Sequence, residues 1–315
     1  MVNLQSKHIL IVGDANADLS AALDRFPHEG DDSLVGALDW SSGGSAANVA
    51  VGLALLAAPV RLLTRVGRDP AADVALWAAR AAGVGLDLVQ RDEVLATGLC
   101  FVGISPGGER TLFSYRGANV GLQLLPQVSD ALESAGWLHV AGHALLEGRQ
   151  RETTLALVDQ AHRCGLPLSL DLCLPLLRVR RDELLDLLPC LAILFANELE
   201  LAALFPGLAR DAALTQALAG AVGLVALKLG PQGCLVAGPA LWQAVPAFPI
   251  AAIDTNGCGD AFVAGFLQAR LCGEAPESCA LQANAMGALT ATRIGAAAAL
   301  PDQKDLRAFL AEHQR

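Results

Sequence analysis

After residue 120, short apolar runs alternate along the chain with longer stretches of mixed polarity. The short runs predict strands at 137–140, 168–172, 193–195 and 225–229. The intervening stretches predict helices at about 149–163, 182–188, 198–204 and 211–220. This alternation predicts a doubly wound α/β fold, with a mostly parallel sheet covered by helices on both faces. Ligands bind such folds at the carboxyl ends of the strands.

The first third of the chain mixes this pattern with β-rich pieces. Strands are expected at 8–13 and 60–66, and helices at 42–58 and 70–82. Runs at 100–105 and 111–115 predict a hairpin around Pro106-Gly107-Gly108. The segments at about 14–40 and 97–119 do not fit the alternation, and we expect them to form a small β-sheet lid over the site. With no long linker or repeat, residues 1–315 are expected to form a single domain.

Composition narrows the class of protein. The net charge of −10 argues against general nucleic-acid binding, which depends on clustered basic residues. The eight cysteines show no C-x-x-C pair or zinc-like grouping, which favours a reduced, cytoplasmic protein. No apolar run approaches the ~18 residues needed to span a bilayer, so no membrane association is expected.

The sequence Asp254-Thr255-Asn256-Gly257-Cys258-Gly259-Asp260 is the strongest chemical signal. Its glycines permit a tight turn, and the apolar run that follows predicts a helix beginning near Asp260. A helix N-terminus attracts anions, so Gly257, Cys258 and Gly259 are predicted to cradle a transferring phosphoryl group. Asp260 is placed to accept the proton of an attacking hydroxyl. The alternative is a turn with Asp260 as an ordinary N-cap.

This motif resembles the second signature of the ribokinase-like, or PfkB, carbohydrate kinases, usually read D-T-x-G-A-G-D, with Cys258 in the place of Ala. Gly43, Gly44 and Asn48 lie in a segment that resembles the family's first signature. The matching motifs run in the family's order from Ile9 to Pro301. The resemblance implies a ribokinase-like fold and ATP-dependent transfer of the γ-phosphate to a sugar hydroxyl, with Asp260 as general base.

The resemblance also assigns substrate and cofactor sites. Asn16, Asp18, Gly43, Gly44 and Asn48 would bind the sugar, with Asp14 as an alternative ligand. ATP would contact Asn197, Lys228, Gly230, Gly233 and Asn284. Mg²⁺ would be held through water near Glu200. Asp254 and backbone oxygens of the segment 290–301 would together bind a monovalent cation. The family's extra Ser hydroxyl is absent near Ala299, which weakens the case for K⁺.

Several of these residues have structural alternatives. Asn197 and Glu200 fit a helix capping box, Lys228 fits a solvent-facing cation, and Asn284 fits a locally bonded helix residue. Arg116 is predicted to reach a substrate phosphate or carboxylate, or else to be a surface residue of the lid. His139 and His143 lack identifiable partners and are expected to be isolated core or loop histidines.

The sequence leaves the substrate open. Ser45-Ala46 replaces the Lys-Gly usual in ribokinases, and 171–175 lacks the D-x-N-x-R of many hexose and ketodeoxysugar kinases. A nucleoside or sugar-phosphate kinase and a non-catalytic sugar-binding regulator are the alternatives. A homodimer through the lid is a further expectation. A nicotinamide-dependent dehydrogenase is disfavoured because no G-x-G-x-x-G follows the first strand.

Overall fold

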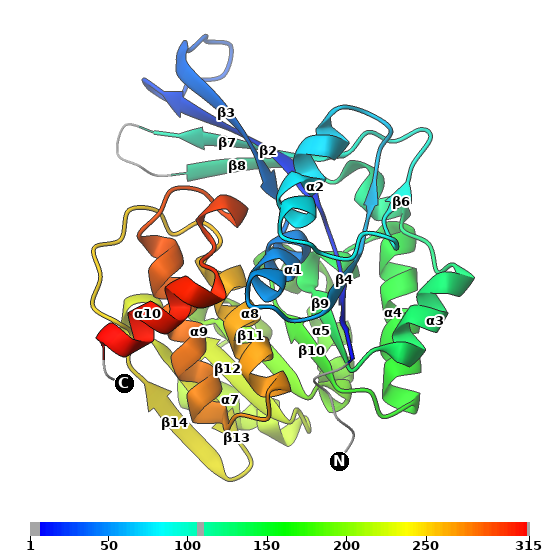
Figure 1. Ribbon diagram of the computed structural model, residues 1–315, viewed down its shortest axis with the longest axis vertical. Coiled ribbons are helices and arrows are strands. Elements are labelled where there is room, and N and C mark those ends of the chain that lie inside the picture. The colour runs from blue at the N-terminus through cyan, green and yellow to red at the C-terminus, as the bar shows by residue number, and fades with distance from the viewer. Residues whose placement is uncertain (1–6, 106–109, 314–315) are drawn as a thin grey trace.

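An eight-stranded sheet forms the centre of the protein. The computed structural model describes residues 7–105 and 110–313 (Figure 1). The strand order is β14-β13-β12-β11-β10-β9-β1-β4. Neighbouring strands are parallel except in the pairs β12–β13 and β13–β14. The predicted mostly parallel α/β sheet is therefore confirmed. Its strands are β1 (Ile9–Val12), β4 (Val60–Leu63), β9 (Trp137–Ala141), β10 (Leu168–Asp171), β11 (Ile193–Asn197), β12 (Leu224–Lys228), β13 (Cys234–Gly238) and β14 (Leu241–Val245).

Helices cover both faces of this sheet (Figure 1). One face carries α1 (Ser45–Leu55), α2 (Ala71–Ala81), α8 (Cys258–Leu271), α9 (Pro276–Ala291) and α10 (Gln303–Glu312). The other carries α3 (Pro126–Ser134), α4 (Gly148–Arg163), α5 (Leu174–Leu187), α6 (Glu198–Leu204) and α7 (Arg210–Ala219). In β1, Ile9 and Ile11 enter the first core and Leu10 and Val12 the second. A continuously apolar strand is therefore buried on both sides.

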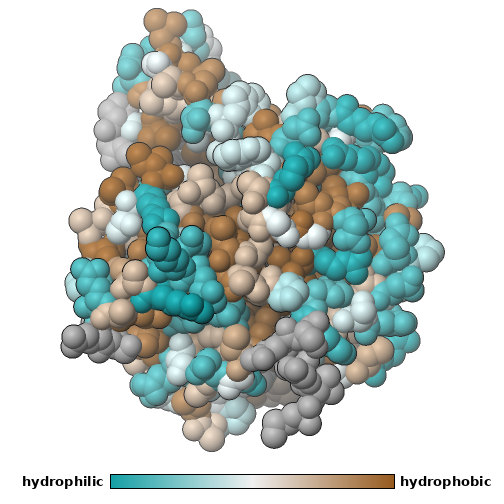
Figure 2. All heavy atoms as spheres, in the orientation of Figure 1, coloured by the Kyte–Doolittle hydropathy of each residue, from teal (hydrophilic) through white to brown (hydrophobic). Residues whose placement is uncertain are grey.

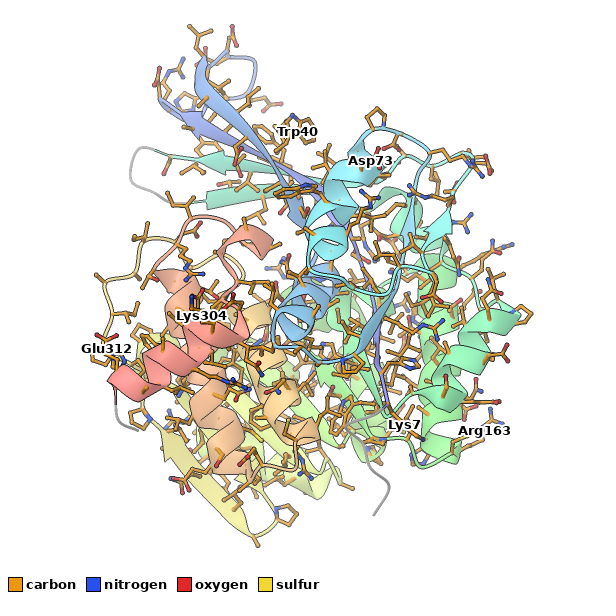
Figure 3. The ribbon with its side chains drawn as sticks, in the orientation of Figure 1. Lys7, Trp40, Asp73, Arg163, Lys304 and Glu312 are labelled. Atoms are coloured by element: carbon orange, nitrogen blue, oxygen red, sulfur yellow. The ribbon has the colours of Figure 1, made fainter. Side chains whose placement is uncertain are left out.

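The lid is a separate four-stranded sheet with the order β3-β2-β7-β8. It consists of β2 (Asn16–Leu23), β3 (Val35–Gly43), β7 (Gly98–Ile104) and β8 (Arg110–Tyr115). The predicted hairpin is β7–β8, although its turn lies outside the described residues. Because β2 follows β1 after three residues, the lid stands at the carboxyl end of the main sheet. Hydrophobic residues gather on it in Figure 2, and Trp40 lies on its α2 side in Figure 3.

Some expected elements differ in extent. The strand expected at 60–66 is interrupted at Thr64, and the second piece, β5 (Arg65–Val66), pairs with β6 (Gln90–Arg91). The helix expected at 182–188 begins earlier, at Leu174, because Pro175 is accommodated in its first turn and a kink at Arg180 joins two helical pieces. The β13–β14 hairpin was not predicted. None of the helices in the described part of the chain is long and apolar enough to cross a membrane.

The order in which strands are added to the main sheet reverses at β1. The strand pairs with β4 on one side and with β9, more than 120 residues away in sequence, on the other. Where the strand order reverses, the loops that leave the two adjacent strands run to opposite faces of the sheet. Ligands of open α/β sheets bind between such loops. The lid, the loop into α1 and the N-terminus of α8 surround this position (Figure 1).

Candidate active site

The N-terminus of α8 is formed by the Gly-rich motif. Gly257 is the N-cap, with φ of 74°. A Cβ at Gly257 would lie 3.0 Å from the Cα of Ala296, so glycine is needed for both conformation and space. The helix begins at Cys258, two residues before the predicted start. The first N–H groups of a helix have no partner within it, and they provide a site for negative charge.

Asp260 lies in the first turn of α8 and is held by two side chains of α1. Ser45 Oγ donates to Asp260 Oδ1 at 2.7 Å, and Asn48 Nδ2 donates to Asp260 Oδ2 at 2.8 Å. Burial raises the pKa of Asp260 to about 6, while these two hydrogen bonds oppose the rise. The alternative of an ordinary N-cap is wrong, because Gly257 occupies that position and Asp260 bonds another helix.

Asp18, on lid strand β2, is the second carboxylate of the site. Burial, and then the charge of Asp260, raises its pKa to about 7. Gly43 leaves room for it, since a Cβ at Gly43 would lie 2.1 Å from Asp18 Oδ2. Gly44 has φ of 94°, and a Cβ there would lie 2.4 Å from the carbonyl oxygen of Asp14. The glycine pair therefore lets the loop into α1 approach both β1 and the lid.

Two acceptor atoms around this centre are buried and unpaired. Asp18 Oδ1 and Asn48 Oδ1 have no hydrogen-bond partner among the described residues. An unpaired buried acceptor costs about 1–3 kcal/mol, so such atoms indicate where a ligand supplies the missing donors. Both atoms belong to residues that interact with Asp260. Asn48 donates a hydrogen bond to Asp260, and the negative charge of Asp260 raises the pKa of Asp18. A ligand with several hydroxyl groups matches this requirement.

A cavity of about 270 Å³ lies against Asp260. It is lined by Ser45, Gly142, His143, Asp171, Leu172, Cys173, Asn197, Glu200, Lys228, Gly257, Gly259 and Asp260. Lys228 Nζ donates to Asp171 Oδ1 at 2.6 Å. Burial opposes the charge of Lys228, but the carboxylates of Asp171 and Glu200 outweigh it and raise the lysine's pKa. The alternative of a solvent-facing lysine is wrong, because the Lys228 side chain is 15% exposed and ion-paired.

A second cavity, of about 420 Å³, has mostly apolar walls. Gly230, Gly233 and Asn284 line it, together with residues of the 247–252 segment, α8 and α9. Asn284 Nδ2 donates to the carbonyls of Val245 and Pro246, so its bonds are long-range rather than local, contrary to the alternative expectation. The volume and apolar lining of this cavity suit a planar heterocycle.

The two cavities share Lys228 and Gly259. A Cβ at Gly259 would point toward Lys228 Nζ, 3.6 Å away, at the place where the cavities join. Asp260 lines only the smaller cavity. An elongated anionic ligand in the larger cavity would therefore pass the α8 N-terminus and Lys228 before it reached Asp260.

Asn197 and Glu200 form a complete capping box at the start of α6. Glu200 N donates to Asn197 Oδ1 at 2.9 Å, and Asn197 N donates to Glu200 Oε2 at 2.8 Å. Both residues also line the smaller cavity, where burial raises the pKa of Glu200 to about 7. The expected capping box is thus confirmed. A role of Asn197 and Glu200 in binding Mg²⁺ stays a prediction.

Asp254 ties the Gly-rich motif to the segment after α9. Its Oδ1 accepts from Asn256 N at 2.7 Å and its Oδ2 accepts from Gly295 N at 2.9 Å. The two segments that the resemblance assigns to a monovalent cation are therefore adjacent. In the described ranges, no cluster of three or more His, Cys, Asp or Glu side chains is arranged to hold a metal ion directly.

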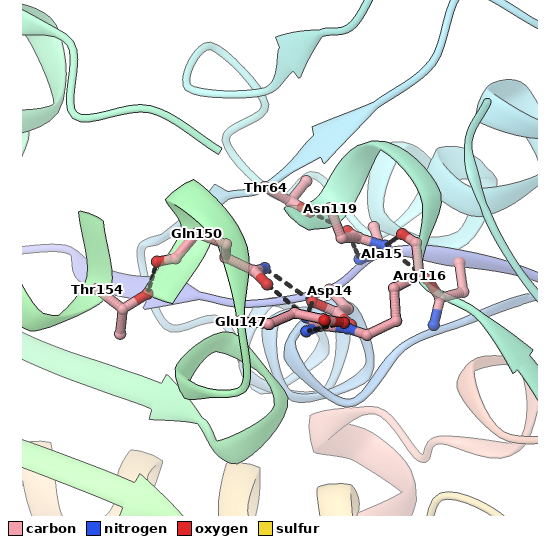
Figure 4. Close-up of polar contacts among 9 residues, drawn as sticks. Asp14, Ala15, Thr64, Arg116, Asn119, Glu147, Gln150 and Thr154 are labelled. Atoms are coloured by element: carbon pink, nitrogen blue, oxygen red, sulfur yellow. Dashed lines mark hydrogen bonds and ion pairs between the residues drawn. The ribbon is translucent and has the colours of Figure 1, made fainter. Parts of the chain in front are cut away.

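Arg116 lies at the end of β8 and bonds inward (Figure 4). Its guanidinium donates to Asp14 from Nε and Nη2 and to Gln150 from Nη2. Its Nη1 lies 3.7 Å from Glu147. The surface alternative is wrong, because the side chain is 14% exposed. Contact between Arg116 and a substrate stays a prediction.

Reasoning from the sequence did not identify three residues of this site. Ser45 was noted only as a departure from the ribokinase pattern, yet it bonds Asp260. His143 was expected to be isolated, yet it lines the smaller cavity, where burial lowers its pKa. Asp171 pairs with Lys228. Its position at the carboxyl end of a predicted strand was the available signal, because ligand-binding side chains gather there.

Comparisons with known proteins agree with this geometry. An ATP-dependent ribose-1-phosphate kinase from Halopiger xanaduensis is 32% identical over 96% of this chain and 98% of its own length. A fructokinase from Klebsiella pneumoniae is 30% identical over 96% of this chain and 99% of its own. The structure of Arabidopsis thaliana ribokinase complexed with ribose and ATP superimposes with a TM-score of 0.86, at 25% identity over 96% of this chain and 98% of that one.

The model of the pfkB family carbohydrate kinases matches residues 6–303, nearly the whole chain. The predicted resemblance, the ribokinase-like fold and the expectation of an ATP-dependent sugar kinase are thereby confirmed. The chain belongs to the pfkB family of carbohydrate kinases.

Proposed function

We propose that this kinase transfers the γ-phosphate of ATP to a hydroxyl of a small sugar, with Asp260 as the general base. The observation that carries the proposal is the junction of two cavities at Lys228 and Gly259, with Asp260 on the far side. The nucleotide occupies the apolar cavity and extends its phosphates past the α8 N-terminus. The acceptor lies under the lid, beside Asp260.

The unpaired acceptors support a sugar as the second substrate. Asp18 Oδ1 and Asn48 Oδ1 accept hydrogen bonds from sugar hydroxyls, which positions a third hydroxyl at Asp260. Asp260 takes the proton of that hydroxyl as the oxygen attacks the phosphorus, and the bond to the ADP oxygen breaks. Lys228 and the N–H groups at the start of α8 stabilise the phosphoryl oxygens during transfer. Closure of the lid excludes water, which would otherwise accept the phosphoryl group.

Mg²⁺ fits the charge balance of the smaller cavity. The carboxylates of Asp171, Glu200 and Asp260 line it with Lys228 as their nearby cation, so negative charge remains to attract a divalent ion. Glu200 and Asn197 are engaged with backbone N–H groups, which favours contact with the ion through water. Bound together with ATP, the ion supplies charge neutralisation for the phosphates.

A monovalent cation beside Asp254 remains a second cofactor proposal. The support is the direct hydrogen bond between Asp254 and Gly295, which brings the two implied loops together. Replacing K⁺ by Na⁺ at constant ionic strength is expected to lower turnover. Equal rates in the two salts would exclude K⁺ activation.

The second candidate acceptor is a sugar phosphate. Arg116 Nη1 is buried without a hydrogen bond in the described structure, beside the exposed Glu147. The relative from Halopiger xanaduensis is named for ribose 1-phosphate. An anionic group on the acceptor would give this nitrogen a stronger partner than Glu147 provides. A nucleoside acceptor and a non-catalytic sugar-binding role remain as alternatives for the same test.

The lid also supports a homodimer. Cross-strand pairing aligns Leu19, Trp40, Phe101 and Phe113 on one face of the lid, and Trp40 and Phe113 are largely exposed. We propose that this face pairs with a second copy of the chain. We also place the enzyme in the reducing cytoplasm, since none of the eight cysteines forms a disulfide in the described structure.

The test is an acceptor panel with ATP and Mg²⁺. ADP release and the phosphorylated product are measured for D-ribose, D-fructose, ribose 1-phosphate and adenosine. Turnover of a free sugar is the expected result. Turnover of ribose 1-phosphate alone would select the second candidate, and adenosine alone would select a nucleoside kinase. Binding of a sugar without ADP release from any acceptor would contradict the kinase mechanism.

A further inference from the structure

Asn119 is the centre of a buried polar network beneath the lid (Figure 4). Its Oδ1 accepts from Ala15 N at 3.2 Å and from Thr64 Oγ1 at 3.3 Å. Its Nδ2 donates to the carbonyl of Arg116 at 3.0 Å and to Asn16 Oδ1 at 2.8 Å. All four hydrogen-bonding positions of the amide lie within reach of polar groups of the protein.

Two backbone groups determine the positions of the amide oxygen and the amide NH₂ of Asn119. The Ala15 N–H can only donate and the Arg116 carbonyl can only accept. A reversed amide would set a donor against the Ala15 N–H and an oxygen against the Arg116 carbonyl. The Ala15 N–H would lose its hydrogen bond, at a cost of about 1–3 kcal/mol. The Arg116 carbonyl would keep only its bond from the Asn119 backbone N–H and would face the repelling amide oxygen. The amide NH₂ of Asn119 therefore faces Asn16.

The orientation of Asn119 dictates that of Asn16. Since Asn119 offers a donor, Asn16 must turn its oxygen toward it and its own NH₂ away. In the described structure, no protein group hydrogen-bonds Asn16 Nδ2, and the residue is only partly buried. A Cβ at Gly98, the residue opposite Asn16 on β7, would lie 2.2 Å from Asn16 Oδ1 and 2.3 Å from Asn119 Nδ2. The lid thus keeps space for this one contact.

Asn16 and Asp18 lie on the same face of β2, because side chains alternate along a strand. Asp18 is close enough to Asp260 for the charge of one to raise the pKa of the other. The NH₂ of Asn16 is therefore on the same face of the lid as Asp18 Oδ1, one of the two unpaired acceptors to which the proposed sugar would donate. This face of the lid then offers one donor and one acceptor to a ligand.

We propose that Asn119 is a positioning residue that makes Asn16 a hydrogen-bond donor to the phosphoryl acceptor. The inference rests on the proposed sugar-kinase function and specifies the polarity of its acceptor site. The group facing Asn16 is an oxygen that accepts, such as a ring oxygen, a hydroxyl lone pair or a phosphate oxygen. The group facing Asp18 is a hydroxyl that donates. Asn119 reaches the substrate only through Asn16.

The test uses Asn119→Asp, with D-ribose, D-fructose and ribose 1-phosphate as acceptors. The variant keeps an oxygen toward Ala15 and Thr64 but, when ionised, has no donor for Asn16. Asn16 then turns its NH₂ to the new carboxylate and its oxygen to the substrate. The acceptor KM is expected to rise at least about tenfold, with the KM for ATP and kcat within about twofold of the parent.

Thr64→Val is the matched control. It removes one of the two donors to the same Asn119 oxygen from the same buried pocket, but the Ala15 N–H still fixes the amide. Its acceptor KM is expected to stay within about twofold of the parent. A rise as large as that of Asn119→Asp would mean that packing rather than amide polarity is responsible, and would overturn the proposal.

Asn16→Asp gives an answer even if Asn119→Asp does not fold. It keeps an oxygen for Asn119 and replaces the ligand-facing NH₂ with a second oxygen. The acceptor KM is expected to rise at least about tenfold. An unchanged acceptor KM would show that the NH₂ is not used, and the positioning role would fail. That result is distinct from failure of the proposed function, in which the parent protein itself releases no ADP with any acceptor.

Discussion

Asn48 and Asp260 are hydrogen-bonded through Nδ2 and Oδ2 at 2.8 Å, although 212 positions separate them in the sequence. This bond joins the start of α1 to the start of α8, so the two Gly-rich motifs form one site. The donor lowers the pKa of a carboxyl that burial raises. The remaining oxygen of Asn48 is buried without a partner in the described structure and faces the acceptor subsite of the proposal.

Replacing Asn48 should shift the pH dependence of catalysis. As general base, Asp260 must be ionised, so kcat/KM of the parent is expected to fall as the pH drops through about 6. Asn48→Ala removes a hydrogen bond to the ionised form, which raises the pKa of Asp260 further. The acid limb of the pH–rate profile should move to higher pH. Ser45→Ala should move it in the same direction, and an unshifted limb in both variants would contradict the assignment.

Neutralising Asp18 should stabilise the fold while removing activity. A carboxyl whose pKa is raised on folding binds its proton more tightly in the folded chain. It therefore lowers stability as the pH rises from its unfolded value, near 4, through its folded value of about 7. Asp18→Asn removes this cost, which should add at least about 1 kcal/mol at pH 8, or ~1–2 °C in Tm for a chain of this length.

The comparison at low pH is the control for this prediction. Below about pH 4 the carboxyl is protonated in both states, so the melting temperatures of Asp18→Asn and the parent should converge. The variant should also lose sugar affinity, because a neutral amide oxygen accepts a hydrogen bond from a substrate hydroxyl more weakly than a carboxylate does. A variant that is less stable than the parent at pH 8 would contradict the proposed burial and repulsion of this carboxylate.

Lys228→Met should affect both stability and nucleotide binding. Loss of the lysine leaves Asp171 buried without its ion pair, at a cost of about 3–5 kcal/mol. The double variant Asp171→Asn/Lys228→Met should recover much of this stability but not the nucleotide affinity, which is expected to fall at least about tenfold. Calorimetry of ATP binding and thermal unfolding separates the two effects.

Lys304→Met provides the control for that experiment. Lys304, labelled in Figure 3, is an exposed residue of α10 and lines neither cavity. The Lys304→Met variant should have unchanged stability and ATP affinity. If the double variant bound ATP as tightly as the parent, Lys228 would have no role at the phosphates.

The lid surface predicts the oligomeric state. Phe113 is 57% exposed and lies on the same face of the lid as Trp40. Hydrophobic residues gather on the lid (Figure 2). Phe113→Glu should convert a dimer to a monomer in light scattering, because it places a charge in the proposed interface. Val94→Glu, at a site 88% exposed outside the lid sheet, should leave the mass unchanged. A monomeric parent at micromolar concentration would exclude the lid dimer.

Local patterns were sufficient to predict the α/β architecture. Strands such as 9–12 and 193–197 are apolar on both faces, and glycines or capping residues mark the neighbouring helices. The β13–β14 hairpin was missed because its pairing depends on the edge of a sheet that is built by distant residues. The local periodicity of hydrophobic residues does not show which distant strands pair.

In the site, too, the sequence identified local motifs but not the contacts that depend on tertiary packing. The Gly-rich motifs and Asp260 were recognisable from residue types and spacing. The partners of Asp260 were not, because Ser45 and Asn48 reach it only once α1 packs on α8. The Lys228–Asp171 pair and the Asn119 network likewise depend on which strands become neighbours. His143 gave no local signal at all.

The most direct test of the central claim is the turnover of Asp260→Asn, measured together with ligand binding. Single-turnover formation of ADP and sugar phosphate is followed with the best acceptor of the panel, and affinities for ATP and sugar are measured by calorimetry. Asp211→Asn, an exposed first-turn residue of α7, is the control. The account predicts near-parental affinities and a rate lowered at least about 10²–10⁴-fold. A rate close to that of the parent would contradict it.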